Sequence, residues 1–349
     1  MCRKLQAPAS CRSTNCRTAT GEEASADRFY TEYIYQQGGS WKNGITENQS
    51  SRTGTRGARN TPCAGIYARS EERGGAYGID SFMAWVGGKK ALREEVLARF
   101  PLYYEGYIEV FGGGGWVLFH KPPGTDFEVY NDLNGNLAAL YRAVRDHPRE
   151  LQERLRYVLN SREDFMRLKQ VLEHPEGMEE VARAAAFYQV IRYSYAAGCG
   201  SFAAQPHSMW GNFPLIDKAC ARLQKVVVEN KDFEKLIRQY DRPVSFFYCD
   251  PPYVDTEDYY SNITFGRGGH ERLRDTLLSA QGKFLLSYND HPLVWEMYDR
   301  PGIYIERVTR LNNMKQRYDG GAQFPELFVS NYEQSERIRV LPEQLSFAS

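Results

Sequence analysis

The sequence has 349 residues, of which 42% are hydrophobic and 25% are charged. That hydrophobic content suffices for one sizeable core or two modest ones, and the charged fraction is ordinary for a globular protein. The 44 basic and 44 acidic residues balance to a formal net charge of zero. The chain-wide basic excess that marks many nucleic-acid-binding proteins is therefore absent. Any surface that binds nucleic acid must come from local segregation of charge.

Membrane insertion and secretion are not expected. No stretch approaches the roughly 18 apolar residues of a membrane span. The first residues carry positive charge without the apolar segment of a secretory signal. The 7 cysteines have no regular spacing, which argues against a disulfide framework. We therefore expect a cytoplasmic protein with free thiols and no metal. A zinc site is the minor alternative, although no C-x2-C pair occurs among Cys2, Cys11, Cys16 and Cys63.

Residues 1–78 differ in composition from the rest of the chain. They are rich in Ser, Thr, Gly, Arg and Asn, and their apolar residues are scattered. Such a segment buries too little apolar surface to offset the entropy of ordering its backbone. We expect a mostly disordered extension, with an upstream segment unrelated to the rest of the protein as the alternative.

From Phe82 onward, helical and strand patterns alternate. We expect helices at about 89–100, 134–145 and 271–279, and strands at about 107–111, 127–130, 225–228, 244–249, 284–288, 304–308 and 327–329. The 244–249 strand is nearly all apolar, as in a strand buried on both faces. The order predicts an α/β, doubly wound (Rossmann-like) sheet over 79–146 and 223–349, with a mainly helical insertion at 147–222.

The run Asp250-Pro251-Pro252-Tyr253 directly follows the 244–249 strand. Prolines cannot continue a central strand, so the run predicts a rigid turn at the strand's carboxyl end, where such sheets bind ligands. The turn offers a carboxylate, a free backbone carbonyl and an aromatic face. The alternative is an ordinary strand-ending turn with an exposed acid.

Transfer of a methyl group to an exocyclic amino nitrogen needs a set of this kind. The nitrogen lone pair is delocalised into the base ring, and acceptors that hold its N–H groups make that lone pair available. An aromatic ring can stack on a base that has left the helix. We therefore interpret Asp250, Pro251, Pro252 and Tyr253 as candidate catalytic residues.

A second set of residues is typical of a nucleoside-bearing cofactor. Glycines at 112–115, including Gly113, follow Phe111 at the end of the first strand, and Asp132 ends the second strand. Glycines let the backbone approach a ligand, and an acid after the second strand commonly binds ribose hydroxyls. A flexible loop is the alternative for the glycine run alone.

Two further sequence segments are weaker indicators of a binding site when each is considered alone. Trp85 and Lys89 flank two glycines before a helix and can offer a stacking face and a cation; an ordinary helix start is the alternative. Asp232 and Phe233 follow the 225–228 strand and could hold an adenine ring. A helix N-cap with a core Phe is equally consistent with that pair.

The insertion mixes basic and aromatic residues, which suits phosphate contact and insertion between base steps. A solvated helical face is the alternative interpretation. The set comprises Arg183, Arg192, Tyr193, Tyr195, Arg222 and Lys225.

Taken in order, these pieces resemble the Dam-type family of adenine-specific DNA methyltransferases over about residues 82–332. The run W-V-G-G-K at 85–89 is similar to the family's W-A-G-G-K, and E-V-F-G-G-G-G at 109–115 to its E-P-F-x-G-x-G loop. N-D-L-N at 131–134 resembles the second acidic motif, and D-P-P-Y at 250–253 matches the catalytic motif without change.

The resemblance implies an enzyme that transfers a methyl group from S-adenosylmethionine to adenine N6 in double-stranded DNA. It implies target-base contacts from the D-P-P-Y turn, target recognition by the insertion, and no obligate protein partner. The implied cofactor contacts are Trp85, Lys89, Phe111, Gly113, Asp132, Asp232, Phe233 and Asp250.

Two departures from the family pattern stand out. Val110 replaces the usual proline, and R-Y-S-Y-A-A-G at 192–198 lacks the Asn of the R-x-S-F-N-G-L stretch in members that read GATC. The sequence therefore does not predict GATC recognition and looks closer to phage or mobile-element relatives, in which restriction-modification is a common setting. The alternatives are a methyltransferase acting on cytosine N4, RNA or a protein amide, and a DNA-binding protein whose catalysis has lapsed.

Overall fold

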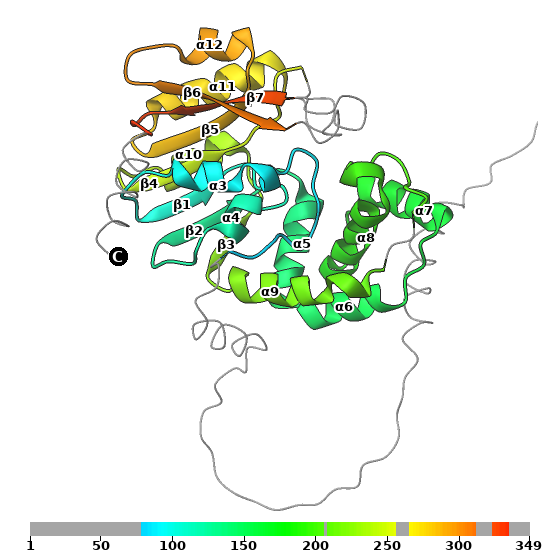
Figure 1. Cartoon of the computed structure of the whole chain (residues 1–349). Coiled ribbons are helices and arrows are strands. Elements are labelled where there is room, and N and C mark those ends of the chain that lie inside the picture. Colours follow the sequence, from blue (N-terminus) through cyan, green and yellow to red (C-terminus); the bar gives the residue numbers. More distant parts are fainter. Residues whose placement is uncertain (1–77, 206–207, 256–264, 312–322, 335–349) are drawn as a thin grey trace, which may run out of the picture. The chain divides into compact units, whose positions relative to one another are not determined.

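The structure is a computed structural model that describes residues 78–205, 208–255, 265–311 and 323–334. All described residues belong to one compact unit within residues 60–349, and they form the coloured part of Figure 1. The expected disordered extension and its four cysteines lie outside the described residues, apart from Gly78. None of the helices described is both long and apolar enough to cross a membrane.

The strands of the described residues form one seven-stranded sheet in the order β3-β2-β1-β4-β5-β7-β6. β1 to β5 run parallel, whereas β7 lies antiparallel between β5 and β6. The expected α/β, Rossmann-like fold is confirmed, and each expected strand is found within a few residues. The strands are β1 (Gly106–Glu109), β2 (Phe127–Asn131), β3 (Val226–Glu229), β4 (Ser245–Cys249), β5 (Lys283–Asn289), β6 (Tyr304–Leu311) and β7 (Gln323–Ser330).

Helices cover both faces of the sheet and build a separate group beside it (Figure 1). They are α3 (Arg93–Ala98), α4 (Trp116–His120), α5 (Gly135–Asp146), α6 (Pro148–Arg156), α7 (Arg162–Glu173), α8 (Glu180–Tyr193), α9 (Phe213–Leu223), α10 (Phe233–Tyr240), α11 (Gly266–Ser279) and α12 (Pro292–Tyr298). Short 3-10 turns are η1 (Lys89–Ala91), η2 (Tyr195–Ala197) and η3 (Trp210–Asn212).

Several helix boundaries differ from expectation for local reasons. The single helix expected at 89–100 is split into η1 and α3 at Leu92. α11 starts five residues earlier than expected, because the glycines of its first turn have poor helix propensity and hide the start. α4 and α12 were not expected, since at five and seven residues they are too short to show a periodic pattern.

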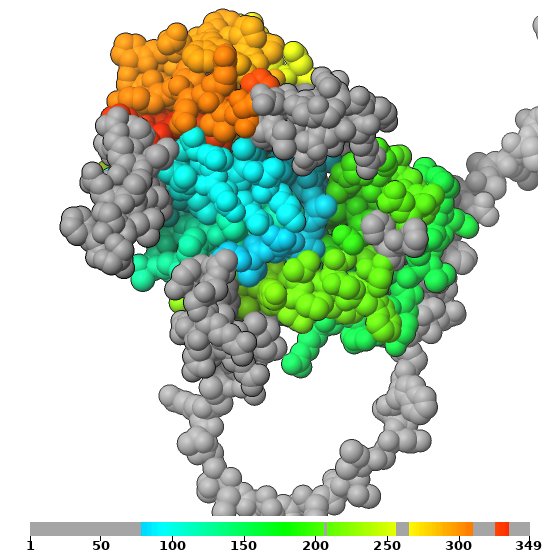
Figure 2. Space-filling model, viewed as in Figure 1, coloured from blue at the N-terminus to red at the C-terminus, as the bar shows by residue number. Residues whose placement is uncertain are grey.

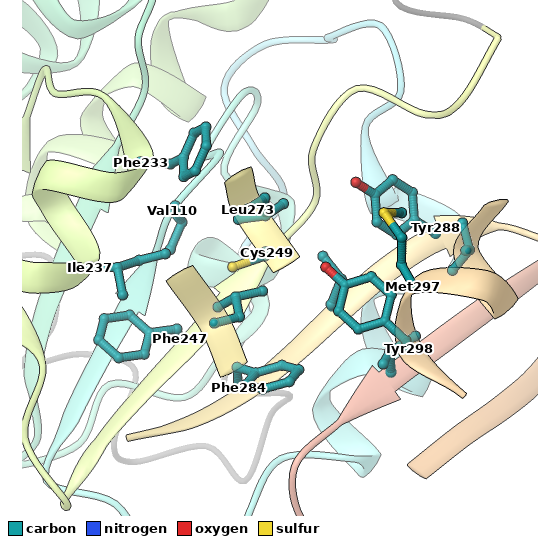
Figure 3. Close-up of a cluster of buried hydrophobic side chains, with 14 of the residues drawn as sticks. Val110, Phe233, Ile237, Phe247, Cys249, Leu273, Phe284, Tyr288, Met297 and Tyr298 are labelled. Carbon is teal, nitrogen blue, oxygen red and sulfur yellow. The ribbon is translucent and has the colours of Figure 1, made fainter. Parts of the chain in front are cut away.

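The strands β1, β4 and β5 at the centre of the sheet are buried on both faces. On one face, α10, α11 and α12 pack against alternate strand residues such as Ile108, Phe247 and Phe284 (Figure 3). On the other face, the ring of Phe100 contacts that of Phe246 edge-on at a centroid distance of 4.6 Å. This alternation follows from the period of two residues in a strand, and it holds the strand ends rigidly in place.

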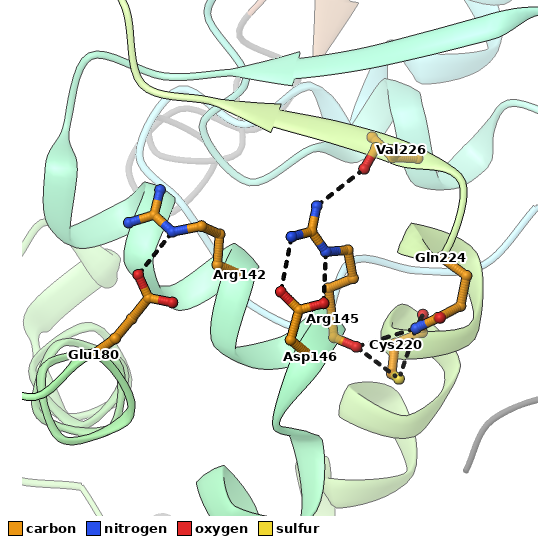
Figure 4. A network of polar contacts seen from close by, with 7 residues as sticks. All are labelled: Arg142, Arg145, Asp146, Glu180, Cys220, Gln224 and Val226. Atoms are coloured by element: carbon orange, nitrogen blue, oxygen red, sulfur yellow. Dashed lines mark hydrogen bonds and ion pairs between the residues drawn. The ribbon is translucent and has the colours of Figure 1, made fainter. Parts of the chain in front are cut away.

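The helices α6 to α9, here called the helical lobe (148–223), are fastened to the sheet through α5. Arg142 of α5 pairs with Glu180 of α8 at 2.8 Å. Arg145 donates to the backbone oxygen of Val226 in β3 at 3.3 Å, and Gln224 donates to the backbone oxygen of Arg145 at 3.1 Å (Figure 4). In the space-filling view, the lobe (green) lies beside the part of the molecule that carries α3 and β1 (cyan) (Figure 2).

A buried ion cluster ties the end of the lobe to the sheet. Arg222 of α9 makes a two-pronged contact with Glu128 of β2, both hydrogen bonds being 2.6 Å long, and Lys121 lies 3.0 Å from the same carboxylate. Burial would raise the pKa of Glu128, but the hydrogen bonds and charges of Arg222 and Lys121 outweigh burial and lower it. Arg222 is only 4% exposed, so its expected role in contacting DNA phosphates is wrong.

We expect Arg222→Met to lower the free energy of unfolding by about 3 kcal/mol, because it leaves a buried carboxylate with only one of its two cations. Urea denaturation followed by circular dichroism measures the change. Arg238→Met is the matched control, since Arg238 forms a surface ion pair with Glu234 and such pairs contribute little. Equal stability of the two variants would contradict a structural role for the buried cluster.

Candidate active site

A cavity of about 500 Å³ lies at the carboxyl ends of the central strands. The strand order reverses between β1 and β4, and loops leaving two such strands turn in opposite directions and leave a crevice. Nine of the eleven predicted site residues line the cavity, whereas Pro251 and Tyr253 do not. The nine are Trp85, Lys89, Phe111, Gly113, Asp132, Asp232, Phe233, Asp250 and Pro252.

The loop after β1 has glycine at positions 112 and 113 because a side chain there would collide with neighbouring rings. Gly113 has a φ of +50°, and a Cβ there would lie 2.7 Å from the ring of Trp85. A Cβ on Gly112 would lie 2.2 Å from the ring of Tyr130. Side chains at these positions would displace both rings, so the loop can lie against the cavity only with glycine.

Asp132 connects this loop to the end of β2. Its carboxylate accepts hydrogen bonds from the backbone N–H of Gly113 at 2.9 Å and of Asn134 at 2.8 Å. Burial raises the pKa of Asp132, and these two hydrogen bonds oppose the rise. Each carboxylate oxygen has a second lone pair, so the side chain can still accept a hydrogen bond from a ligand in the cavity.

An aromatic wall closes another part of the cavity. The ring of Phe233 lies 5.7 Å from that of Phe111 and 5.8 Å from that of Phe265, with the guanidinium of Arg272 over its face at 4.4 Å. Asp232 caps α10 by accepting from the N–H of Glu234, and its other oxygen pairs with Arg272. The helix-cap interpretation of this pair is therefore confirmed, and both residues also line the cavity.

The turn after β4 carries the shortest ion pair between described residues that line the cavity. Lys89 Nζ lies 2.5 Å from Asp250 Oδ1, and the two side chains are 7% and 17% exposed. The same ammonium lies 4.7 Å from the centre of the Tyr253 ring. The sequence segments at 85–89 and 250–253, which are 161 residues apart at this contact, thus meet at one point.

Glu109, the last residue of β1, is a second acid in the cavity wall. Tyr107 donates its hydroxyl to Glu109 Oε2 at 2.7 Å. Burial raises the pKa of Glu109 to about 8, against the hydrogen bonds from Tyr107 and the Leu118 backbone, and the charge of Asp250 adds to the rise. The carboxyl is therefore mostly protonated at neutral pH.

The helical lobe completes the cavity from the opposite side, which the sequence did not predict. Lys169 of α7 and Arg183 and Phe187 of α8 line it, together with Ala197, Gly198 and Cys199. In the turn at 195–199, three residues other than glycine have a positive φ: Ala196 (51°), Ala197 (56°) and Cys199 (55°). Such strain persists only where the surrounding structure imposes it.

Two aromatic residues that we expected to contact DNA differ in exposure. Tyr193 is buried, whereas Tyr195 is 59% exposed.

Glu326 is another residue near Asp250 that sequence reasoning missed. It stands in β7 and its carboxylate lies 4.0 Å from Lys89 Nζ. The available signal was weak: a single acid at the start of the apolar run Leu327-Phe328-Val329. Phe265 and Arg272 gave no signal, because nothing in the sequence places α11 against Phe233.

The fold and the cavity define a Rossmann-like α/β protein with a ligand-sized cavity at its topological switch point. The family model for D12 class N6 adenine-specific DNA methyltransferases matches residues 85–314, and the chain belongs to this family. It is therefore a DNA adenine methyltransferase, as the sequence motifs predicted. Transfer to cytosine N4, to RNA or to a protein amide is thereby set aside.

Curated relatives agree with this family. A type II methyltransferase from Lactococcus lactis subsp. cremoris is 29% identical over 72% of this chain and 95% of its own length. A type II methyltransferase from Paramecium bursaria Chlorella virus NC1A is 24% identical over 62% of this chain and 85% of its own. A DNA adenine methylase from Haemophilus influenzae is 23% identical over 71% of this chain and 92% of its own.

The pKa of Glu109 gives a testable dependence of stability on pH. As pH rises from the ordinary value of 4.5 to about 8, the unfolded chain has lost this proton and the folded protein still holds it. The contribution of Glu109 to the free energy of unfolding should therefore fall across this window and level off above it. Glu109→Gln lacks the titrating group and should gain stability relative to the wild type as pH rises.

Urea denaturation at about pH 5 and about pH 8, near the two ends of this window, measures the difference. Glu153→Gln, at an acid 63% exposed, serves as the control and should track the wild type. A difference between Glu109→Gln and the wild type that does not vary with pH would contradict a buried, protonated Glu109.

Proposed function

We propose that the protein transfers a methyl group from S-adenosylmethionine to adenine N6 in double-stranded DNA, with Asp250, Pro251, Pro252 and Tyr253 acting on the target base. The observation that carries this proposal is the convergence of the glycine loop, Asp132 and the Asp250 turn on one cavity at the switch point. Neither the donor nor the role of any residue follows from the family match alone.

The residues of the cavity fit the proposed donor. A volume of about 500 Å³ lies within the range of pockets that hold small ligands and cofactors. Asp132 would accept hydrogen bonds from the ribose hydroxyls, and Gly113 would bring its backbone close to the ligand. Phe111 and Phe233, with Asp232 beside them, would hold the adenine ring. Trp85 and Lys89 would contact the amino-acid end.

The bound donor would supply an electrophilic methyl group on a sulfonium. The chain's own part is to hold the target amino group in line with that methyl group and to make its lone pair available. Asp250 Oδ and the carbonyl oxygen of Pro251 would accept the two N–H hydrogen bonds, and the Tyr253 ring would stack on the base. Lys89 Nζ, 2.5 Å from Asp250 Oδ1, holds that carboxylate in place. Proximity and orientation supply most of the acceleration, without a covalent enzyme intermediate.

We assign target recognition to the helical lobe, within the insertion at 147–222. Its turn at 195–199 borders the cavity and carries the exposed Tyr195. A surface formed by this lobe and the adjoining cavity mouth would contact both strands of a duplex. Comparing methyl transfer to duplex and single-stranded oligonucleotides tests the choice of duplex DNA.

Asp132→Ala should weaken S-adenosylmethionine binding by about 1–3 kcal/mol, because it removes the ribose acceptor and frees the Gly113 N–H. Isothermal titration calorimetry measures the affinity. Asp132→Asn keeps one acceptor oxygen and should lose less, and Asp275→Ala, at a surface ion pair, should bind like the wild type. Equal affinity of Asp132→Ala and the wild type would remove Asp132 from the cofactor site.

Asp250→Ala should slow methyl transfer by about 100-fold or more, as expected when a preorganised polar group at the reacting centre is lost. DNA binding should persist, since phosphate contacts supply most of the affinity. Transfer of a radiolabelled methyl group to adenine-containing duplex and a gel-shift measurement separate the two effects. Asp299→Ala, at an exposed acid after α12, is the control. An Asp250→Ala variant as active as the wild type would exclude the turn from the mechanism.

A further inference from the structure

Glu326 of β7 is a buried acid that the mechanism above does not use. It lies opposite Asn289 of β5 and Val308 of β6, and it is 1% exposed. A carboxylate this deep in a sheet is costly unless charged or polar groups compensate it. Its partners therefore indicate what it does.

Those partners surround the catalytic turn. The hydroxyl of Tyr253 donates to Glu326 Oε2 at 2.8 Å. Lys89 Nζ lies 4.0 Å from the same oxygen and also stands over the Tyr253 ring. Glu326 thus contacts two residues that lie close to Asp250: Tyr253, which follows β4, and Lys89, which pairs with Asp250.

The contact with Tyr253 fixes that ring at its free end. Two prolines hold the backbone before Tyr253, and a hydrogen bond to an acid on a rigid strand holds its hydroxyl. Burial, together with the charges of Glu326 and Asp250, raises the pKa of Tyr253 well above its ordinary value, so the hydroxyl remains a donor at neutral pH. The phenolic O–H prefers to lie in the plane of its ring, so donation to Glu326, together with Lys89 over the face of the ring, favours one orientation of that plane.

We propose that Glu326 is a positioning residue for methyl transfer, which holds the Tyr253 hydroxyl and thereby fixes the plane on which the target adenine stacks. This inference rests on the proposed role of Tyr253 in binding the target base. Glu326 is not among the residues that line the cavity, and its hydrogen bond to Tyr253 is much shorter than its distance to Lys89, so we expect its effect to pass through Tyr253.

A double-mutant cycle tests that path. Glu326→Met removes the acceptor at similar volume, Tyr253→Phe removes the donor, and the double variant removes both. The substrate is a duplex containing the site methylated in DNA of an expressing host. Each single variant should slow single-turnover transfer by about tenfold, and the double variant should be no slower than the slower single one, as for residues that act as a unit. Glu326→Gln keeps an acceptor oxygen and should transfer faster than Glu326→Met.

A second readout does not depend on methyl transfer. With 2-aminopurine at the target position and no donor present, fluorescence should be quenched when the base stacks on Tyr253, and should be brighter with Glu326→Met. Affinity for S-adenosylmethionine should stay within about twofold, because no cofactor contact is lost. Glu306→Gln, on the neighbouring strand and paired with Arg99, is the matched control and should behave as the wild type.

Multiplicative losses in the double variant would overturn the inference, since they mean that Glu326 acts independently of Tyr253. Equal losses in Glu326→Gln and Glu326→Met would also overturn it and would assign the effect to charge near Lys89. If Glu326→Met does not fold, the comparison of Glu326→Gln with Tyr253→Phe is sufficient. Equally slow methyl transfer by these two variants would overturn the inference. A wild type that transfers no methyl to adenine would contradict the proposed function, whereas an active wild type with an equally active Glu326→Met contradicts only this inference.

Discussion

The reversal of strand order between β1 and β4 is the constraint on which the site depends. On one side of this point the chain continues to β2 and β3, and on the other to β5 and the β7–β6 hairpin. The connections therefore leave the two central strands in opposite directions and open a cavity between them. The glycine loop after β1 and the prolines after β4 are local solutions to that one constraint: one allows close approach, and the other ends a buried strand without leaving N–H donors unpaired.

Charge in the cavity is arranged around a small number of buried groups. Lys89 lies between Asp250, at 2.5 Å, and Glu326, at 4.0 Å. Glu109, whose pKa is raised to about 8, is mostly protonated and therefore uncharged at neutral pH. A protein with a net charge of zero can thus concentrate acids at one point without accumulating mutual repulsion. The Glu128–Arg222 pair also compensates a buried charge. Arg222, which the sequence suggested for DNA contact, neutralises the buried carboxylate of Glu128.

Much of the fold and most of the candidate site could be predicted from the sequence. The strand at 244–249 is apolar throughout and ends in two prolines, and these signals are local. By contrast, Arg222 and a surface arginine look the same in a sequence, because burial is decided by what α9 packs against. Long-range packing of α8 and α11 brings Arg183 and Phe265 to the cavity, and packing of β7 brings Glu326 to Tyr253 and Lys89. No local pattern encodes those contacts. Asp232 is a mixed case: its N-cap signal is local, but its place at the cavity depends on β3.

Helix α8 has ten of its fourteen residues buried, and its apolar residues face in all directions. A helix that is apolar on all sides is buried among other elements. α8 packs against α5 on one side and against α6 and α7 of the lobe on the other. Exchanging the whole lobe for that of a relative with another recognition sequence would therefore expose α5 and strip one wall from the cavity. A chimaera designed to change sequence preference should keep α6, α8 and α9 and vary only exposed positions of the turn after α8, such as Tyr195. Ala197, Gly198 and Cys199 of the same turn line the cavity and should stay unchanged. Under the proposed role of the lobe in target recognition, sequence preference would diversify at exposed turn positions while the supporting helices stay fixed.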